Sequence, residues 1–267
     1  MPTAKLPTRR VVKPWGVRAL PPPFVPDSDE RIGEIWFEPP PGCPLLVKYL
    51  FTSERLSIQV HPDDRQARAR GLAAGKEECW YILAAEPGAQ LGIGTVRPLD
   101  GDAMKSAAQS GALEQLMQWH DVAAGMFFHI PAGTVHAIGG GVTLIEIQQN
   151  SDVTYRLYDY GRPRALHLED GAAVARAVPM PIQLQQMIDP NKSTSLLDSD
   201  HLGVAHVVGN NLAPLADLGS DMMLVPLAGP LTVDNVVAVP GECLWSTGAA
   251  VITAGDDARF LAGWFKG

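Results

Sequence analysis

The stretch SIQVHPDD, from Ser57 to Asp64, places an amide and an imidazole two residues apart within an apolar run. Successive side chains of a β-strand point to opposite faces, so Gln59 and His61 would share one face with Ser57. An imidazole nitrogen and an amide oxygen on one face are able to ligate the same cation. A QxH pair on its own is more often the polar face of a half-buried strand, so the metal hypothesis needs further ligands elsewhere in the chain.

A second stretch, GMFFHIPAGTVHAI from Gly125, fits the spacing G-x5-P-x-G-x2-H and ends that pattern at His136. It resembles the second motif of the cupin superfamily, in which a strand, a Pro-Gly turn and another strand bring a histidine to a metal inside a small β-barrel. The asparagine usual in that motif is replaced by Gly140. The first cupin motif, HxH followed closely by Glu, is also altered: His61 is preceded by Gln59, and the best-placed acid is Glu78 in GKEECWYIL.

This altered set resembles that of the type I mannose-6-phosphate isomerases, and the resemblance covers most of the first two thirds of the chain. The segments that carry it are KPWG at Lys13, PLLVKYLFTSERLSIQVHPDD at Pro44, GKEECWYIL at Gly75 and IPAGTVHAIGGGVTLIEIQQNSDVTYRLYDYGR at Ile130. The resemblance implies one divalent ion per chain, with four ligands: Gln59, His61, Glu78 and His136. Two imidazoles, a carboxylate and an amide oxygen suit Zn and require no thiolate.

The same resemblance implies an isomerase that interconverts D-mannose 6-phosphate and D-fructose 6-phosphate through a cis-enediol. Removing a proton next to a carbonyl creates negative oxygens, which a cation stabilises as a Lewis acid without changing its redox state. By the resemblance, Arg156, Lys76 and Glu146 are catalytic, and Ser57, Lys76 and Arg156 bind substrate. The planar Arg156 fork suits either an enediolate or a phosphate. Glu146 is either the general base or a carboxylate that holds Arg156 or a metal-bound histidine.

Two other functions fit a metal-binding β-barrel. A cupin oxygenase would need a redox-active metal in a facial triad with open positions, and the long gap between His61 and Glu78 disfavours it. A non-catalytic sugar-phosphate-binding cupin would not need Lys76, Glu146 and Arg156, and all three are present. Metal analysis with oxygen uptake separates the first of these from an isomerase, and a turnover assay separates the second.

The composition limits the partners. The chain has 21 Lys and Arg against 29 Asp and Glu, a net charge of -8, which disfavours nucleic acid or an anionic membrane. Cys43, Cys79 and Cys243 form an odd count without CxxC spacing, which favours reduced thiols in a cytosol. Neither a signal-peptide core in MPTAKLPTRRVVKPWG nor an 18-residue apolar run is present. We expect a cytoplasmic monomer or homodimer that binds a small sugar phosphate.

The 23 prolines and 26 glycines separate short apolar runs, a pattern typical of many strands joined by turns. Expected strands span 34–38, 45–51, 55–60, 78–84, 125–130, 134–138 and 142–148. With the resemblance, they predict a mostly β fold: a cupin-type jelly-roll barrel over 1–165 and a shorter, cupin-like β domain without metal ligands over 166–267. Small helical insertions are expected at 63–72 and, as two short helices broken at Ser110-Gly111, within 102–119. Gly139 to Gly141 predicts a hairpin turn.

Overall fold

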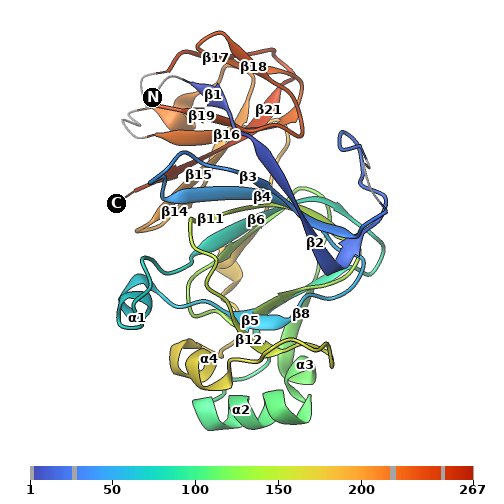
Figure 1. Cartoon of the computed structure of the whole chain (residues 1–267). Coiled ribbons are helices and arrows are strands. Elements are labelled where there is room, and N and C mark those ends of the chain that lie inside the picture. The colour runs from blue at the N-terminus through green and yellow to red at the C-terminus, as the bar shows by residue number, and fades with distance from the viewer. Residues whose placement is uncertain (1–2, 26–28, 217–220, 248–249, 267) are drawn as a thin grey trace.

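The computed structural model describes residues 3–25, 29–216, 221–247 and 250–266, which form layers built mostly of β-strands (Figure 1). Residues 1–2 and 26–28 of the predicted first domain, and 217–220, 248–249 and 267 of the predicted second, lie outside the described residues. The mostly β fold predicted from the short apolar runs is confirmed. Among the described residues, no helix is long and apolar enough to cross a membrane.

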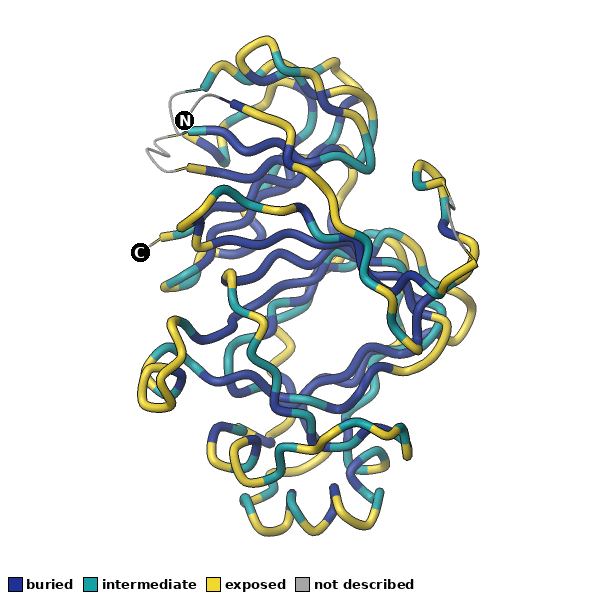
Figure 2. The backbone as a smooth tube through the Cα atoms, in the orientation of Figure 1, coloured by how far each residue is buried: buried dark blue, intermediate teal, exposed yellow. Residues whose placement is uncertain are grey.

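A seven-stranded antiparallel sheet lies at the centre of the molecule, in the order β13-β9-β6-β11-β4-β3-β2. Its strands are β2 (Thr8–Val17), β3 (Ile32–Phe37), β4 (Leu45–Phe51), β6 (Glu78–Ala85), β9 (Met126–Ile130), β11 (Val142–Gln149) and β13 (Gln185–Met187). Both of its faces are covered by other layers, and its inner strands β3, β4 and β11 are coloured mostly as buried in Figure 2, whereas the edge strands β2 and β13 are mostly intermediate or exposed.

A five-stranded sheet faces the central sheet, in the order β12-β5-β10-β7-β8. Its strands are β5 (Ile58–Val60), β7 (Gln90–Thr95), β8 (Met117–Asp121), β10 (His136–Ile138) and β12 (Tyr155–Tyr158). Large apolar side chains fill one end of the space between the two sheets, among them Trp80, Ile82, Leu91, Ile93 and Phe128. The two sheets together form the barrel.

The central sheet is buried on both faces because other layers cover it, and strand β4 shows how its two faces differ. All seven residues of its sequence LLVKYLF are buried. Leu45, Val47, Tyr49 and Phe51 belong to the core that packs against the C-terminal sheet. The alternate position, Lys48, faces the barrel interior. A lysine in a continuous apolar run is therefore explained by the face on which it lies.

The C-terminal part of the chain covers the outer face of the central sheet with a six-stranded sheet, in the order β1-β19-β16-β21-β15-β14. Its strands are β1 (Ala4–Lys5), β14 (Thr194–Asp198), β15 (Leu202–Val208), β16 (Met222–Ala228), β19 (Leu244–Ser246) and β21 (Arg259–Phe265). A small sheet of β17 (Leu231–Val233), β18 (Val236–Ala238) and β20 (Ile252–Ala254) closes its far side. Strand β1 pairs with β19, so an N-terminal segment completes the C-terminal sheet.

Short helices cover the outer face of the five-stranded sheet, at the bottom of Figure 1. They are α2 (Gly101–Ser110), α3 (Leu113–Leu116) and α4 (Leu168–Val174), while α1 (Asp64–Arg68) lies to one side and two single 3-10 turns span Ile182–Leu184 and Ala213–Leu215. Asp63 begins α1 with a capping box, because its Oδ1 accepts from Gln66 N at 2.7 Å and Gln66 Oε1 accepts from Asp63 N at 3.0 Å. Gly111, at φ 78°, ends α2 at the predicted break.

Two local predictions were wrong in this part of the fold. The second helix of the insertion ends at Leu116, because Met117 and Trp119 pair with β7 as part of β8, and this edge pairing overrides the helical spacing of the apolar residues. Gly139 to Gly141 is not a hairpin turn: β10 pairs with β5 and β7, whereas β11 pairs with β4 and β6. The glycines therefore carry the chain from one sheet to the other. A Cβ on Gly139 would lie 2.2 Å from Gln90 O, so the close approach requires glycine.

Candidate metal centre

Three potential ligands from three strands or strand ends meet inside the barrel. His61 follows β5, Glu78 begins β6 and His136 begins β10. Their candidate ligand atoms lie within 4.8 Å of one another, and all three side chains are buried. Glu78 Oε2 lies 3.5 Å from His61 Nε2, and Glu78 Oε1 lies 3.4 Å from His136 Nε2. The carboxylate therefore sits between the two imidazoles.

Backbone carbonyls fix both imidazoles in one tautomer. Nδ1 of His61 lies 2.8 Å from Val153 O, and Nδ1 of His136 lies 2.9 Å from Thr134 O. A carbonyl only accepts, so each Nδ1 carries the proton and each Nε2 presents a lone pair to the centre. Such a second hydrogen bond is the usual way in which a protein orients a histidine ligand.

Gln59 brings its amide to the same place from the neighbouring position on the strand face. It lies directly opposite His136 in the pairing of β5 with β10, and its Nε2 is 3.2 Å from His136 Nε2. Ser57 Oγ donates to Gln59 Oε1 at 3.2 Å. Rotating the amide by a half turn exchanges these two atoms, presents the oxygen to the centre and lets the nitrogen donate to Ser57.

The unpaired atoms at this centre fit a cation. Glu78 Oε1 and His61 Nε2 are buried without a hydrogen-bond partner in the described part of the chain, and such orphaned atoms are costly unless a ligand binds them. Burial, with the charges of Lys76 and His136 nearby, holds the pKa of His61 well below its ordinary value. Burial lowers the pKa of His136 to about 4, so both imidazoles are neutral and competent to ligate.

The carboxylates next to the centre differ in their electrostatic surroundings. Burial and the charge of Glu146 raise the pKa of Glu78 to about 7. Glu146 is buried too, but the charges of Lys48 and Lys76 outweigh that burial and lower its pKa to about 2. Lys48 Nζ lies 3.1 Å from Glu146 Oε1, and Trp80 Nε1 donates to Glu146 Oε2 at 3.1 Å. Glu146 is therefore held as an anion, whereas the negative charge of Glu78 is stabilised less, and a bound cation would lower its pKa.

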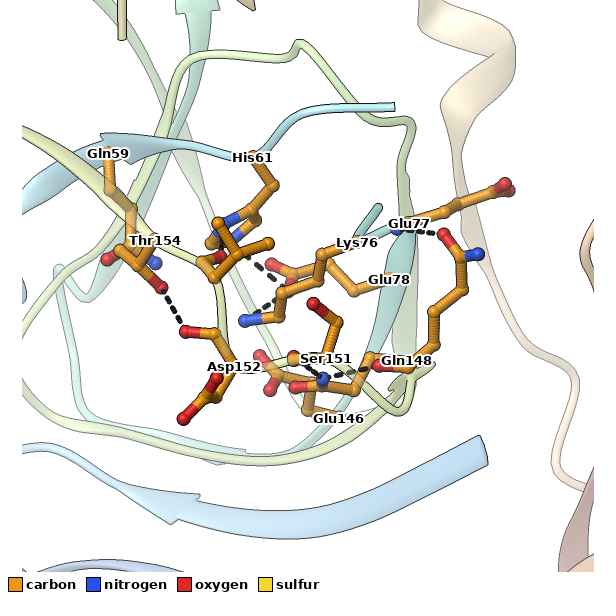
Figure 3. A network of polar contacts seen from close by, with 12 residues as sticks. Gln59, His61, Lys76, Glu77, Glu78, Glu146, Gln148, Ser151, Asp152 and Thr154 are labelled. Carbon is orange, nitrogen blue, oxygen red and sulfur yellow. Dashed lines mark hydrogen bonds and ion pairs between the residues drawn. The ribbon is translucent and has the colours of Figure 1, made fainter. Parts of the chain in front are cut away.

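Lys76 lies against the centre but not on a strand, although its position two residues before Glu78 predicts that the two side chains share a strand face. Strand β6 begins at Glu78, and Lys76 precedes it in an irregular segment. The backbone N–H of Lys76 donates to Pro62 O at 3.0 Å. Its Nζ still reaches Glu78 Oε2 at 3.1 Å, as Figure 3 shows. Burial opposes its charge, but Glu78 and Glu146 outweigh that effect and raise its pKa.

A cavity of about 300 Å³ opens beside the centre and is lined by both sheets. All of the sequence-predicted catalytic and substrate-binding residues, Ser57, Lys76, Glu146 and Arg156, line it. Arg156 lies on β12, directly opposite Gln59 on β5, so the two side chains share a sheet face. The predicted residues are thus brought together, although their individual roles stay predictions.

Sequence reasoning missed several polar residues of this cavity. Lys48 and Trp36 are neighbours across β3 and β4, and Lys48 Nζ lies 4.4 Å from the Trp36 ring centroid. Lys13 Nζ pairs with Glu34 Oε1 at 3.3 Å on the same side of the barrel. A lysine inside a strand that is apolar at every other position was the available signal for Lys48. Arg164, on the loop after β12, also lines the cavity and had no such signal.

We expect removal of metal to destabilise the protein, because an ion that binds only the folded chain stabilises it. At a free zinc concentration of about 100 times the dissociation constant, the stabilisation is about 2.7 kcal/mol, which corresponds to a melting temperature about 5–10 °C higher. Calorimetry with and without a chelator measures this shift. The Glu78→Gln variant is the control, since the chelator should not change its melting temperature. An equal melting temperature for chelated and zinc-loaded wild-type protein would contradict the metal assignment.

Comparison with solved structures defines the fold. The crystal structure of a mannose 6-phosphate isomerase from Bacillus subtilis matches with a TM-score of 0.77 at 22% identity, over 98% of this chain and 99% of that chain. A zinc-bound mannose 6-phosphate isomerase matches with a TM-score of 0.71 at 14% identity, over 100% of both chains. The chain therefore has the fold of the solved phosphomannose isomerases, and the predicted jelly-roll architecture is confirmed.

Comparison of sequences points to the same group of proteins. The mannose-6-phosphate isomerase of Streptococcus mutans is 40% identical over 154 residues, which are 53% of this chain and 48% of that protein. No family model matches the chain. The chain spans about half the length of the curated relatives it matches. The resemblance carried by the four quoted segments is confirmed by these similarities.

Proposed function

We propose that the protein is a metal-dependent aldose-ketose isomerase that interconverts D-mannose 6-phosphate and D-fructose 6-phosphate through a cis-enediol, with one zinc ion per chain. The observation that carries this proposal is a buried set of two neutral imidazoles and a carboxylate with one unpartnered oxygen, Glu78 Oε1, beside a cavity with a cationic lining. A metal for the sugar oxygens and cations for a phosphate are what this reaction requires.

Gln59, His61, Glu78 and His136 would hold the ion, which when bound would supply Lewis acidity to neighbouring sugar oxygens. The other tasks fall to the chain itself. Lys76 is charged and buried beside Glu78, so it acts as a hydrogen-bond donor to substrate oxygens rather than as a base. Its ammonium also compensates part of the negative charge that develops next to it.

Glu146 is the candidate for the proton acceptor, because it is ionised and lines the cavity. Lys48 and Trp80 donate to its two oxygens, and a carboxylate held in this way is a weak base. The Lys48 contact must therefore loosen as the proton moves to Glu146. Lys48 would therefore govern how basic Glu146 is, and the side chains that Glu146 contacts are Lys48 and Trp80 rather than Arg156 or a histidine.

Arg156 is the candidate for charge stabilisation. Its Nε is buried without a partner in the described part of the chain, and its Nη1 donates to Ala165 O at 2.9 Å. It thus retains donors for a substrate oxyanion. Ser57 lies beside Gln59 and supplies a hydroxyl to the same cavity.

The test is the formation of fructose 6-phosphate from mannose 6-phosphate by the purified protein, before chelation, after chelation and after zinc is added back. We expect turnover that disappears with the metal and returns with zinc. Oxygen uptake with an iron-loaded sample should be absent. If folded, zinc-loaded protein shows no turnover but still binds mannose 6-phosphate, the function is that of a non-catalytic sugar-phosphate-binding cupin.

The remaining assignments belong to the same proposal. A small sugar phosphate as the partner agrees with the cationic cavity, and a cytoplasmic setting agrees with three free, buried cysteines, Cys43, Cys79 and Cys243. A catalytic domain over 1–165 followed by a β domain without metal ligands over 166–267, and a monomer or homodimer, complete it. Size-exclusion chromatography with light scattering tests the oligomeric state.

A further inference from the structure

The loop after β12 brings a second arginine to the mouth of the cavity. Arg156, on the strand, and Arg164, on the loop, both line the cavity. The buried carboxylate of Asp159 lies between them in sequence, with 2% of its side chain exposed. Asp159 and Arg164 have no role in the ligand set or in the chemistry described above.

Asp159 holds Arg164 with both of its oxygens. Arg164 Nε donates to Asp159 Oδ2 at 2.6 Å, and Arg164 Nη2 donates to Asp159 Oδ1 at 2.6 Å. This paired contact fixes the plane of the guanidinium. In the part of the chain that the structure describes, Nη1 of Arg164 makes no hydrogen bond, so the fork keeps donors for a ligand.

The loop itself is built to hold this geometry. Tyr160 and Gly161 have φ values of 54° and 77°, and Arg162 N donates to Asp159 O at 3.0 Å, as in a tight turn with two left-handed residues. A tyrosine in that conformation is disfavoured and persists only where its surroundings impose it. Arg162 anchors the turn from outside the cavity, with Nη1 3.2 Å from Asp159 Oδ1 and Nη2 3.1 Å from Glu54 Oε2.

The ion pairs of the cavity lining leave one cation without an acidic partner in the described residues, although the carboxylate of Asp152 lines the cavity as well. Lys13 pairs with Glu34, Lys48 with Glu146 and Lys76 with Glu78. Arg164 pairs with Asp159, but Arg156 makes no ion pair within the described ranges, and its side chain donates only to the Ala165 carbonyl. Burial, and then the charge of Arg164, lower the pKa of Arg156. Two guanidinium groups close enough to repel each other favour a dianion between them.

We propose that Arg156 and Arg164 together bind the phosphate group of the substrate, with Asp159 as the positioning residue that orients Arg164. This inference rests on the proposed function, since the phosphate is that of the sugar phosphate. Two planar forks match the oxygens of a phosphate better than ammonium groups do. Arg164 would therefore decide between phosphorylated and unphosphorylated sugars.

The test compares zinc-loaded wild-type protein with Arg164→Ala in steady-state kinetics. We expect the KM for mannose 6-phosphate to rise about 10-fold or more, because a charge-assisted bidentate contact is lost. The kcat and the zinc content should stay within about twofold, since the metal ligands are untouched. Inorganic phosphate, used as a competitive inhibitor, should weaken by a similar factor.

Three further variants separate positioning from general damage. Asp159→Asn should raise KM and leave kcat, because Arg164 loses its orientation and not its charge. Arg164→Lys should recover part of the affinity by restoring the charge, and it replaces Arg164→Ala if that variant does not fold. Arg55→Ala is the matched control, because Arg55 also pairs with a carboxylate, that of Glu114, yet does not line the cavity.

The two proposals fail in different ways. If the wild-type protein turns over and Arg164→Ala keeps the same KM and phosphate inhibition, the phosphate site is wrong and the isomerase stands. If the wild-type protein shows no turnover, the isomerase is wrong, and the anion site is then tested by the rise in melting temperature with inorganic phosphate. A rise in wild-type protein that is absent from Arg164→Ala supports the site, and an equal rise in both overturns it.

Discussion

Replacing His136 with alanine is expected to remove bound zinc and isomerisation together. His136 presents Nε2 to the centre, 3.4 Å from Glu78 Oε1, and its tautomer is fixed by Thr134 O. Loss of an outer partner of a ligand typically lowers metal affinity by about 10- to 100-fold, so loss of the ligand itself should cost more than about 100-fold. Elemental analysis after dialysis, together with turnover of mannose 6-phosphate, measures both effects.

His120→Ala is the matched control for that substitution. His120 lies on β8, which pairs with β7, the strand beside His136 on β10. It contacts Ile93 O at 3.3 Å and is no part of the metal centre. This variant should keep one zinc ion per chain. Zinc content that is equal in His136→Ala and wild-type protein would show that His136 is not a ligand.

The candidate ligands could be proposed from sequence because each lies in a short motif with its own local pattern. Gln59 and His61 alternate on a strand, and His136 follows a Pro-Gly turn. These patterns alone do not predict that the residues meet, because Glu78 and His136 lie on different sheets, which come together only when the barrel forms. The resemblance supplied that long-range information, and the geometry agrees with it.

The residues that were missed owe their positions to tertiary structure. Lys48 looks like an irregularity in a buried strand until β4 is paired with β11, which sets Lys48 directly opposite Glu146. Asp159 and Arg164 lie in a loop whose sequence, YDYGRPRA, has ordinary turn residues. Only the left-handed turn at Tyr160 and Gly161 brings the carboxylate and the guanidinium into contact.

The local errors have the same origin. Met117 and Trp119 continue the helical spacing of the residues before them, but they form a strand, β8, because they pair with β7 at the edge of the sheet. Lys76 was expected on a strand, and the irregular segment that carries it still delivers its Nζ to Glu78. The periodicity of apolar residues describes one segment of the chain by itself, whereas its pairing partners determine whether that segment forms a helix, a strand or a loop.

Strand β11 of the central sheet packs against the C-terminal layer on one face and carries Glu146 on the other. Ile145 and Ile147 flank Glu146 on β11 and pack into the core shared with Val204, Met223 and Leu261 of the C-terminal part. Glu146 itself faces the barrel interior. Because side chains alternate along β11, a catalytic candidate on one face is supported from the other face by the C-terminal layer, in which none of the candidate ligands lies.

Arg156→Ala is expected to keep zinc and folding but to lower kcat by about 100- to 1,000-fold, the range found when one donor to a developing oxyanion is removed. Arg156 sits directly opposite Gln59, close to the metal centre, whereas Arg164 lies farther along the chain on the loop. The two substitutions should therefore have different kinetic effects. Arg156→Ala should change both kcat and KM, whereas Arg164→Ala should change KM alone. Arg156→Lys, which keeps the charge but not the planar fork, should fall between Arg156→Ala and wild-type protein. Retention of full kcat by Arg156→Ala, with zinc content verified, would remove Arg156 from the chemistry and leave it only a phosphate ligand.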